Sequence, residues 1–501
     1  MRVIFLGIGA EQLGVQQLSA ILKREGHQVG LAFTPSLFDD KYHLHVPVLA
    51  RLFSRDQQVI DQAVAFRPDV VAFSALTMTY RWGLQVAAEV KRRTGAKVIF
   101  GGVHPSAVPH VVIADPVVDA ICVGEGDVAF PAWLRAVQQG DESGAIDQIW
   151  FKRADGVVVQ GKQRPFLQDL DALPVIDKGL YEDHVRIRDV YITMTGRGCP
   201  YRCTFCFNNF WARLPGQDGV AGGKYVRQRS VDHVIAELVE AKQRWKIKYV
   251  DFEDDIFTID KVWLHEFLER YRREVGLPWM CLTHPKYVDQ DIVDGLAAAG
   301  CEWVQLGIQS VDEQHRFHTM KRYEKVGDTA WAIDAFRKAG VGVKGDHILG
   351  SVGEGVASQE LARAFYATHT PSRISPFWMT WLPGVDITRQ ALDSGDLTPE
   401  QLAGIERGDP TFFRQSSVRD PQLRRQLQSY AALFQLMPVL PAPLRRHLRP
   451  EWLDHVPVPA LDKLTMATDL VAGFASGNPE HAAYARFYLT HMARRVWPRS
   501  R

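Results

Sequence analysis

Short runs rich in Val, Ile and Phe alternate with amphipathic stretches through most of this chain. A run of this kind without polar alternation is typical of a parallel strand buried on both faces, and the stretch between two runs has the length of a covering helix. In the first part of the chain, these runs lie at 3–7, 28–33, 70–76, 97–102 and 120–126. We therefore expect residues 1–140 to form an α/β domain with a doubly wound, five-stranded parallel sheet.

The alternation resumes with longer helices after residue 188. Strands are expected at 190–195, 249–253, 279–283, 303–308, 341–348 and 377–381. The pattern thus predicts a Rossmann-like sheet followed, over 188–395, by a partial (β/α)6 TIM-type barrel. Residues 141–187 are expected to be a connector with a hairpin at 150–160. Strand signals are absent after residue 396, so 396–501 is expected to be a C-terminal helical region.

Composition agrees with an ordinary globular protein. The 501 residues are 46% hydrophobic and 23% charged, and the length predicts two or three domains. Lys and Arg number 59 against 58 Asp and Glu, so the net charge of +1 gives no bulk attraction to nucleic acid or an anionic membrane. No apolar run reaches the roughly 18 residues of a transmembrane segment, and the first run is too short for a signal peptide. We expect a cytoplasmic protein.

Three of the six cysteines lie close together in the sequence. Cys199, Cys203 and Cys206 have CxxxCxxC spacing, in the loop that follows the first expected barrel strand. Barrel active sites form at this carboxyl end of the strands. Closed zinc sites use four ligands, whereas three cysteines around an iron–sulfur cube leave one iron open. The alternative is a zinc loop completed by a distant histidine such as His284 or His347.

With the aromatic Phe205 before its last cysteine, the loop resembles the CxxxCxφC signature of the radical S-adenosylmethionine superfamily. The resemblance implies that Cys199, Cys203 and Cys206 bind a 4Fe–4S cluster. The open iron of that cluster would bind S-adenosylmethionine, and one-electron reduction would yield a 5′-deoxyadenosyl radical. An electron donor such as flavodoxin or ferredoxin is implied as a partner.

Later barrel segments resemble the same superfamily where its members contact S-adenosylmethionine. The contacts implied by the resemblance are Phe205, Glu253, Asp254, Asp255, Gln309, Ser310 and Ile348. For Asp254 and Asp255 the alternative is an acidic turn at a helix N-terminus. His347 is expected to be a packed, hydrogen-bonded histidine rather than a ligand.

The expected strands of the first domain end in glycine-rich turns. Ligands of doubly wound sheets bind beyond these carboxyl ends, although tight turns alone would also explain single glycines. The domain resembles the cobalamin-binding domain of the cobalamin-dependent radical S-adenosylmethionine branch. The pocket residues implied are Leu13, Gly14, Ser74, Thr77, Gly101, Gly102, His104, Gly124, Glu125 and Gly126. The cobalt-binding motif DxHxxG is absent after the first strand, so no cobalt ligand is assigned, and the lone Gly7-x-Gly9 makes NAD a much weaker candidate.

The resemblance implies a methyltransferase that places a methyl group on an unactivated carbon or phosphorus centre of a small molecule, using the radical and methylcobalamin. The first alternative is a non-methylating enzyme of oxidative ring formation or rearrangement, similar to the anaerobic magnesium-protoporphyrin ester cyclases. A more distant alternative is a cobalamin-binding sensor or carrier without catalysis. The sequence does not identify the substrate, because aromatic residues such as Trp378 and Trp381 serve equally well as core.

Overall fold

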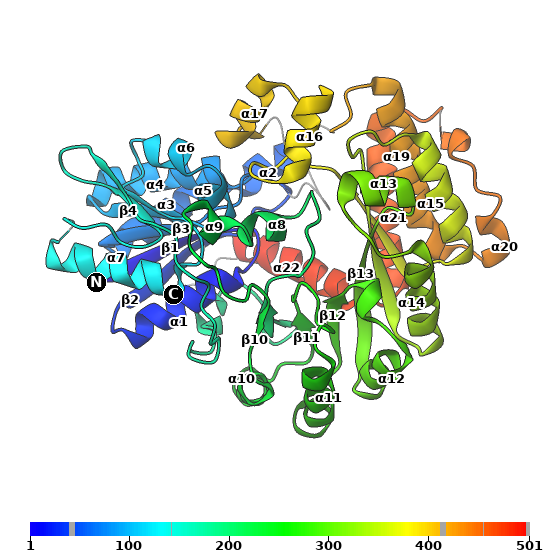
Figure 1. The fold of residues 1–501 in the computed structure, drawn as a ribbon, viewed down its shortest axis with the longest axis horizontal. Helices are drawn as coiled ribbons and strands as arrows, with labels where there is room; N and C mark the ends of the chain where they lie inside the picture. The colour runs from blue at the N-terminus through cyan, green and yellow to red at the C-terminus, as the bar shows by residue number, and fades with distance from the viewer. Residues whose placement is uncertain (40–45, 142, 411–416, 454, 497–501) are drawn as a thin grey trace.

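The computed structural model describes residues 1–39, 46–141, 143–410, 417–453 and 455–496. It contains two large sheets with helices on their faces, and a C-terminal set of helices packed beside the second sheet (Figure 1). The α/β class and the order of its parts, expected from the alternation of apolar runs, are confirmed.

All five expected strands of the first sheet are present and parallel. They are β1 (Arg2–Ile8), β2 (Gln28–Thr34), β3 (Val70–Ser74), β4 (Lys97–Gly101) and β5 (Ala120–Cys122). The sheet nevertheless has seven strands, in the order β2-β1-β3-β4-β5-β6-β7. The hairpin expected within the connector forms β6 (Ile149–Lys152) and β7 (Val158–Gln160), and it pairs antiparallel with β5. This hairpin satisfies the backbone groups that would otherwise be unpaired at the edge of β5.

Helices cover both faces of this sheet, as a doubly wound fold requires. Alternate residues of β1 enter two different cores: Val3 and Phe5 face one side, and Ile4 and Leu6 face the other. The first side is covered by α1 (Leu13–Arg24) and α7 (Gly126–Gln139). The second is covered by α3 (Asp56–Ala65), α4 (Tyr80–Thr94), α5 (Val103–Ala107) and α6 (Pro109–Ala114). A short helix, α2 (Pro47–Phe53), precedes α3.

The second sheet is an open barrel of six parallel strands. In sequence order they are β8 (Tyr191–Thr193), β11 (Val250–Phe252), β12 (Trp279–Thr283), β13 (Cys301–Gln309), β14 (Gly342–Leu349) and β15 (Arg373–Trp378). The partial barrel is confirmed, because β8 and β15 are the two edges of the sheet. The last strand begins four residues earlier than expected, since Arg373 already pairs with Lys344 of β14. The outer face of the barrel is covered by α10 (Val231–Trp245), α11 (Lys261–Arg270), α12 (Gln290–Ala298), α14 (Val326–Lys338) and α15 (Val356–Thr368).

The expected C-terminal helical region is also confirmed. It contains α17 (Pro399–Glu406), α19 (Pro421–Leu436), α20 (Ala442–Arg445), α21 (Val458–Ala475) and α22 (Pro479–Val496), and it is preceded by α16 (Asp386–Ser394). The last helix connects the two sheets (Figure 1). Near its start, Glu480 pairs with Lys344 of the barrel at 2.9 Å, and further along, the Tyr488 hydroxyl accepts a hydrogen bond from Phe38 of the first domain.

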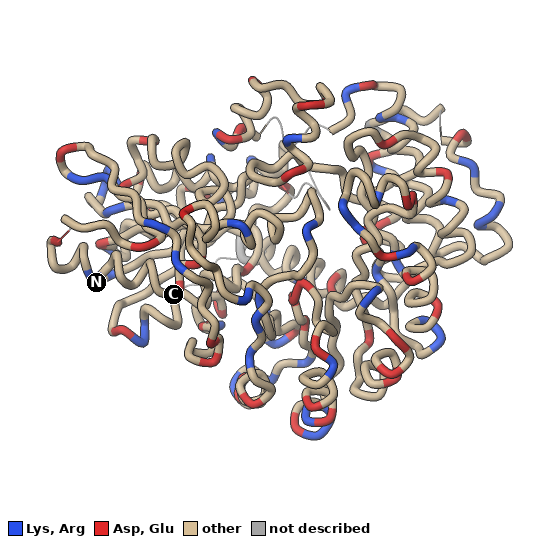
Figure 2. Tube along the Cα trace, viewed as in Figure 1, with Lys and Arg blue, Asp and Glu red and all other residues tan. Residues whose placement is uncertain are grey.

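Charges of both signs are interspersed along the whole trace (Figure 2). This distribution agrees with the net charge of +1. None of the helices in the described residues combines the length and the hydrophobicity needed to cross a bilayer.

Candidate cofactor and active site

A cavity of about 500 Å³ lies between the first sheet and the start of the barrel. Its barrel side includes Met194, Gly198, Asn208 and Tyr225. Its other side is formed by residues expected to bind cobalamin, namely Leu13, Gly14, Ser74, Gly102, Gly124, Glu125 and Gly126. Beyond the carboxyl ends of the strands is where ligands of doubly wound sheets bind.

Glycine is required in two of the turns that form this cavity. Gly102 and Gly124 have φ of 94° and 104°, a conformation that side chains disfavour. A Cβ at Gly102 would also lie 3.0 Å from the Ser74 hydroxyl oxygen. A smaller cavity of about 60 Å³ adjoins the first and is lined by Gly101. These glycine-lined surfaces fit a bulky cofactor that approaches the backbone closely.

Thr77 and His104, also expected at the cobalamin pocket, are among the lining residues of neither cavity. Both are buried, and the Thr77 hydroxyl lies 3.2 Å from His104 Nδ1. The His104 ring packs 4.4 Å from the ring of Tyr80. Both side chains thus lie in the core of the first domain, outside the linings of the two cavities.

Ion pairs join the two walls of the interdomain cavity of about 500 Å³. Arg197 of β9 (Gly196–Arg197) forms a bidentate pair with Asp127 at 2.7 and 3.0 Å, and Arg227 of β10 (Arg227–Gln228) pairs with Glu125 at 2.8 Å. Burial alone would raise the pKa of Asp127, but the charge and hydrogen bonds of Arg197 outweigh it and the pKa is lowered. Asp127 and both arginines were missed by sequence reasoning, which had no local signal for pairs between domains.

The three cysteines lie in the loop between β9 and α8 (Phe207–Trp211). Cys203 is buried, and the other two are half-buried. The loop is fastened to the segment after β13, because Thr204 donates from its backbone to Met320 O at 3.1 Å and from its hydroxyl to Thr319 O at 2.7 Å. Burial raises the pKa of Cys199 to about 12 and that of Cys203 to about 11. Iron coordination would supply the charge that deprotonates these thiols.

The donor set fits an iron–sulfur cube. Within the described part of the chain, no three His, Cys, Asp or Glu side chains form a group that would hold one metal ion. A cube does not require such convergence, because each cysteine binds a different iron.

The two histidines considered as zinc ligands have other neighbours. His284 stacks on the ring of Tyr201 at 4.3 Å and lies 3.5 Å from Glu324. His347 hydrogen-bonds with the Tyr366 hydroxyl and Gln359 Oε1, both at 2.9 Å. The packed histidine expected at position 347 is confirmed.

Acidification should destabilise the fold through His347. Burial lowers the pKa of this histidine to about 4, below the ordinary 6.5. The unfolded chain therefore binds a proton that the native state does not, so stability is lost as the pH falls from 6.5 towards 4. The difference predicts a loss of about 2 kcal/mol from this residue at pH 5. Denaturant unfolding at pH 7 and pH 5 measures the effect. The difference in the free energy of unfolding between the two pH values should be smaller for His347→Gln than for wild type, and it should equal the wild-type difference for the control His318→Gln, at an exposed position.

Asp254 fixes the backbone of residues 195–196, which lead into the cysteine loop. Its buried carboxylate accepts hydrogen bonds from Thr195 N, Thr195 Oγ1 and Gly196 N at 2.6–3.0 Å. Burial, partly offset by these bonds, raises its pKa to about 6. The alternative of a helix N-terminal turn is wrong, because α11 begins at Lys261 and is capped by Asp260.

The other two carboxylates of this segment are accessible. Although Glu253 is exposed, the protein around its carboxylate partly desolvates it, and this effect, followed by the charge of Glu480, raises its pKa. Asp255 is also exposed and accepts a hydrogen bond from Asn208 Nδ2 at 2.6 Å. These two carboxylates are thus the ones still available to a substrate or cofactor ammonium group.

The remaining predicted contacts lie around the same end of the barrel. Gln309 ends β13 with φ of 64°, after a register shift in its pairing with β14. Ser310 is buried and its hydroxyl accepts from Asp312 N at 3.2 Å. Phe205 and Ile348 are half-buried and belong to the same apolar cluster as Trp381. That cluster accounts for Trp381 as core packing.

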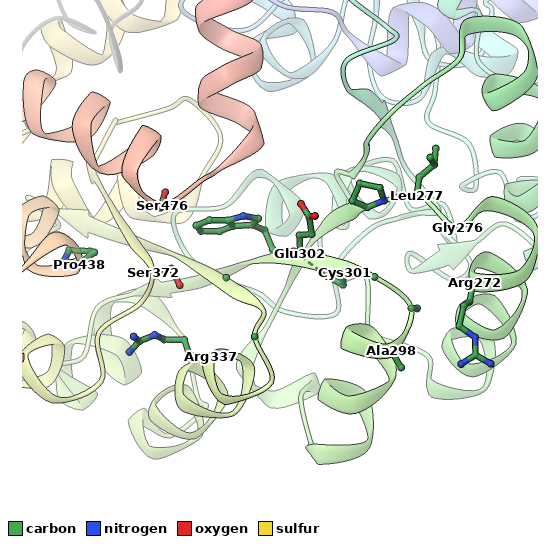
Figure 3. Close-up of a pocket in the computed structure, with 16 residues that line it drawn as sticks. Arg272, Gly276, Leu277, Ala298, Cys301, Glu302, Arg337, Ser372, Pro438 and Ser476 are labelled. Atoms are coloured by element: carbon green, nitrogen blue, oxygen red, sulfur yellow. Dashed lines mark hydrogen bonds between the residues drawn. The ribbon is translucent and has the colours of Figure 1, made fainter.

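A larger cavity of about 870 Å³ lies at the opposite end of the barrel (Figure 3). It is formed where β12, β13 and β14 begin, and Glu302, Arg337 and Ser476 are among its lining residues. Barrel active sites form at the carboxyl ends of strands. We therefore place the candidate site at the interdomain cavity of about 500 Å³.

Comparisons with known families agree with both halves of this site. Residues 8–134 match the model of the B12 binding domain, and residues 193–364 match that of the radical SAM superfamily. The chain is a member of the cobalamin-dependent radical S-adenosylmethionine enzymes. The cofactors of this class are cobalamin, a 4Fe–4S cluster and S-adenosylmethionine.

The similarity to individual relatives is low in sequence identity. The chain is 27% identical over 302 residues to an uncharacterized methyltransferase, PH0819, of Pyrococcus horikoshii, a match covering 58% of this chain and 63% of that relative. It is 22% identical over 440 residues to the cytidylyl-2-hydroxyethylphosphonate methyltransferase of Streptomyces wedmorensis, covering 78% and 79%. The fold is similar to that of the cobalamin-dependent S-adenosylmethionine radical enzyme OxsB, with a TM-score of 0.65 at 14% identity, over 97% of this chain and 83% of that one.

Proposed function

We propose that the protein transfers a methyl group to an unactivated carbon or phosphorus centre of a small molecule. One observation carries the proposal: the cysteine loop and the glycine-rich turns share a cavity. Gly198 directly precedes Cys199, and both Gly198 and Asn208 line the space that Gly102 and Gly124 bound from the other side. A methyl donor on one wall and a radical source on the other would face a common chamber.

We assign the cofactors to this chain's residues as follows. Cys199, Cys203 and Cys206 hold the cluster, Glu253 and Asp255 are the accessible carboxylates for S-adenosylmethionine, and the glycine-rich turns hold cobalamin. When bound, these groups supply a 5′-deoxyadenosyl radical and a transferable methyl group.

The protein's own task is orientation and the exclusion of water. The Arg197–Asp127 and Arg227–Glu125 pairs join the two walls. Asp254 holds the backbone that leads into the cysteine loop. A reactive radical has to be kept dry and close to its target, and rigid walls serve both requirements.

The proposal includes an external one-electron donor such as flavodoxin or ferredoxin, because no described group of the chain is itself a source of electrons. All six cysteines are free, which fits a reducing compartment such as the cytoplasm.

The test is an anaerobic reconstitution with iron, sulfide and cobalamin, followed by reductant, S-adenosylmethionine and a small-molecule extract. Nucleoside products are then quantified by mass spectrometry. Methyl transfer predicts S-adenosylhomocysteine and 5′-deoxyadenosine in comparable amounts, both dependent on cobalamin. Formation of 5′-deoxyadenosine alone would favour ring formation or rearrangement, and formation of neither by a cluster-loaded enzyme would favour a sensor or carrier.

A further inference from the structure

Asn208 donates twice towards a cysteine sulfur. It lies two residues after Cys206, at the start of α8. Its backbone N is 3.4 Å and its Nδ2 is 3.8 Å from Cys206 Sγ, both within the range of N–H···S hydrogen bonds. One backbone and one side-chain donor of the same residue therefore point at the same sulfur.

The orientation of the Asn208 amide is set by two further partners. Its Oδ1 accepts a hydrogen bond from the Tyr225 hydroxyl at 2.5 Å, and its Nδ2 donates to Asp255 Oδ1 at 2.6 Å. A reversed amide would place Oδ1 against the Asp255 carboxylate and the sulfur, both of which are acceptors. Tyr225 and Asp255 thus keep the NH2 group turned towards Cys206.

We propose that Asn208, held by Tyr225 and Asp255, is a positioning residue that raises the reduction potential of the iron–sulfur cluster. The inference rests on the proposed role of Cys206 as a cluster ligand. Reduction of the cluster from the 2+ to the 1+ state adds one electron, supplied by the external donor, and part of the added negative charge resides on sulfur. Hydrogen bonds to the sulfurs stabilise that charge and favour the reduced state.

The position of this hydrogen-bond chain ties it to the proposed reaction. Tyr225 and Asn208 both line the interdomain cavity. Tyr225 donates a hydrogen bond to Asn208, and Asn208 in turn donates to Cys206, which is not among the residues that line the cavity. Tyr225 and Asn208 would therefore form part of the chamber wall and, through Cys206, influence how readily the cluster accepts an electron.

The test is an EPR-monitored redox titration of the reconstituted holoenzyme and its variants. Asn208→Ala retains the backbone donor and loses the side-chain donor, so its midpoint potential should shift to more negative values. Tyr225→Phe releases the amide from one partner and should shift it in the same direction by a smaller amount. Asn209→Ala is the matched control, because Asn209 is on the same helix but donates to Asp386 at 2.7 Å.

An unchanged potential in Asn208→Ala, with iron and sulfide content equal to wild type, would overturn the proposal. If Asn208→Ala cannot hold the cluster, Tyr225→Phe decides: a negative shift supports the role and an unchanged potential refutes it. A wild-type protein that incorporates no cluster would instead contradict the proposed function, so the two failures are distinguishable.

Discussion

Replacing Cys203 by alanine is expected to abolish formation of 5′-deoxyadenosine. Cys203 is the central and most buried of the three clustered thiols, and two remaining cysteines cannot hold a cube that already has one open iron. The purified variant, reconstituted anaerobically, should lack the cluster's visible absorption and EPR signal and contain little iron. Product formation should fall to the level of a reaction without enzyme.

Cys301→Ala is the matched control for this experiment. Cys301 is equally a buried free thiol, but it lies at the amino end of β13, at the end of the barrel opposite the proposed site. Its loss should leave iron content and the EPR signal at wild-type levels. Retention of a full cluster and of 5′-deoxyadenosine formation by Cys203→Ala would rule out the assignment of this loop as the cluster site.

Replacing Glu324 by alanine should give the largest loss of stability, about 3–5 kcal/mol. Its carboxylate is fully buried and pairs with Arg316 and, at 2.6 Å, with Arg322. Removing it would leave two buried guanidinium groups without their shared counter-ion. Denaturant unfolding of the apoprotein at neutral pH measures the effect.

Burial is what makes the Glu324 pairs important for stability, and Glu89 provides the comparison. Glu89 also pairs with two arginines, Arg92 and Arg93, but on the surface of α4. Glu89→Ala should change stability little, because water screens exposed pairs. Equal effects of the two variants would show that the buried network contributes no more than a surface pair.

The pH dependence of the Glu324 network has a definite sign. Burial would raise the pKa of Glu324, but the neighbouring His284, 3.5 Å away, and the charges of both arginines lower it well below the ordinary value of 4.5. A carboxylate with a lowered native pKa stabilises the fold above its unfolded pKa, and this contribution is lost as the pH falls below about 4.5. Glu324→Ala should therefore differ less from wild type in acid than at neutral pH.

Some features of this protein follow from local sequence. The runs of Val, Ile and Phe predicted all five parallel strands of the first sheet and all six of the barrel, because strand burial on both faces leaves a direct mark on composition. The spacing of Cys199, Cys203 and Cys206 and the glycines at 102 and 124 are local in the same sense. Ligand spacing within one loop and the need for positive φ are properties of a few consecutive residues.

Other features were decided only by packing between distant segments. The hairpin at 149–160 joined the edge of β5, and Arg197 found Asp127, 70 positions away in the sequence. Asp254 accepts a hydrogen bond from the backbone of Thr195, and the side chains of Thr77 and His104 are buried in the core of the first domain. The sequence alone determined which elements form and which residue types the site contains; the tertiary structure decided which side chains reach the cavity. The physical reason is that buried polar groups take whichever partner the folded chain brings within hydrogen-bond distance, and no local period records that choice.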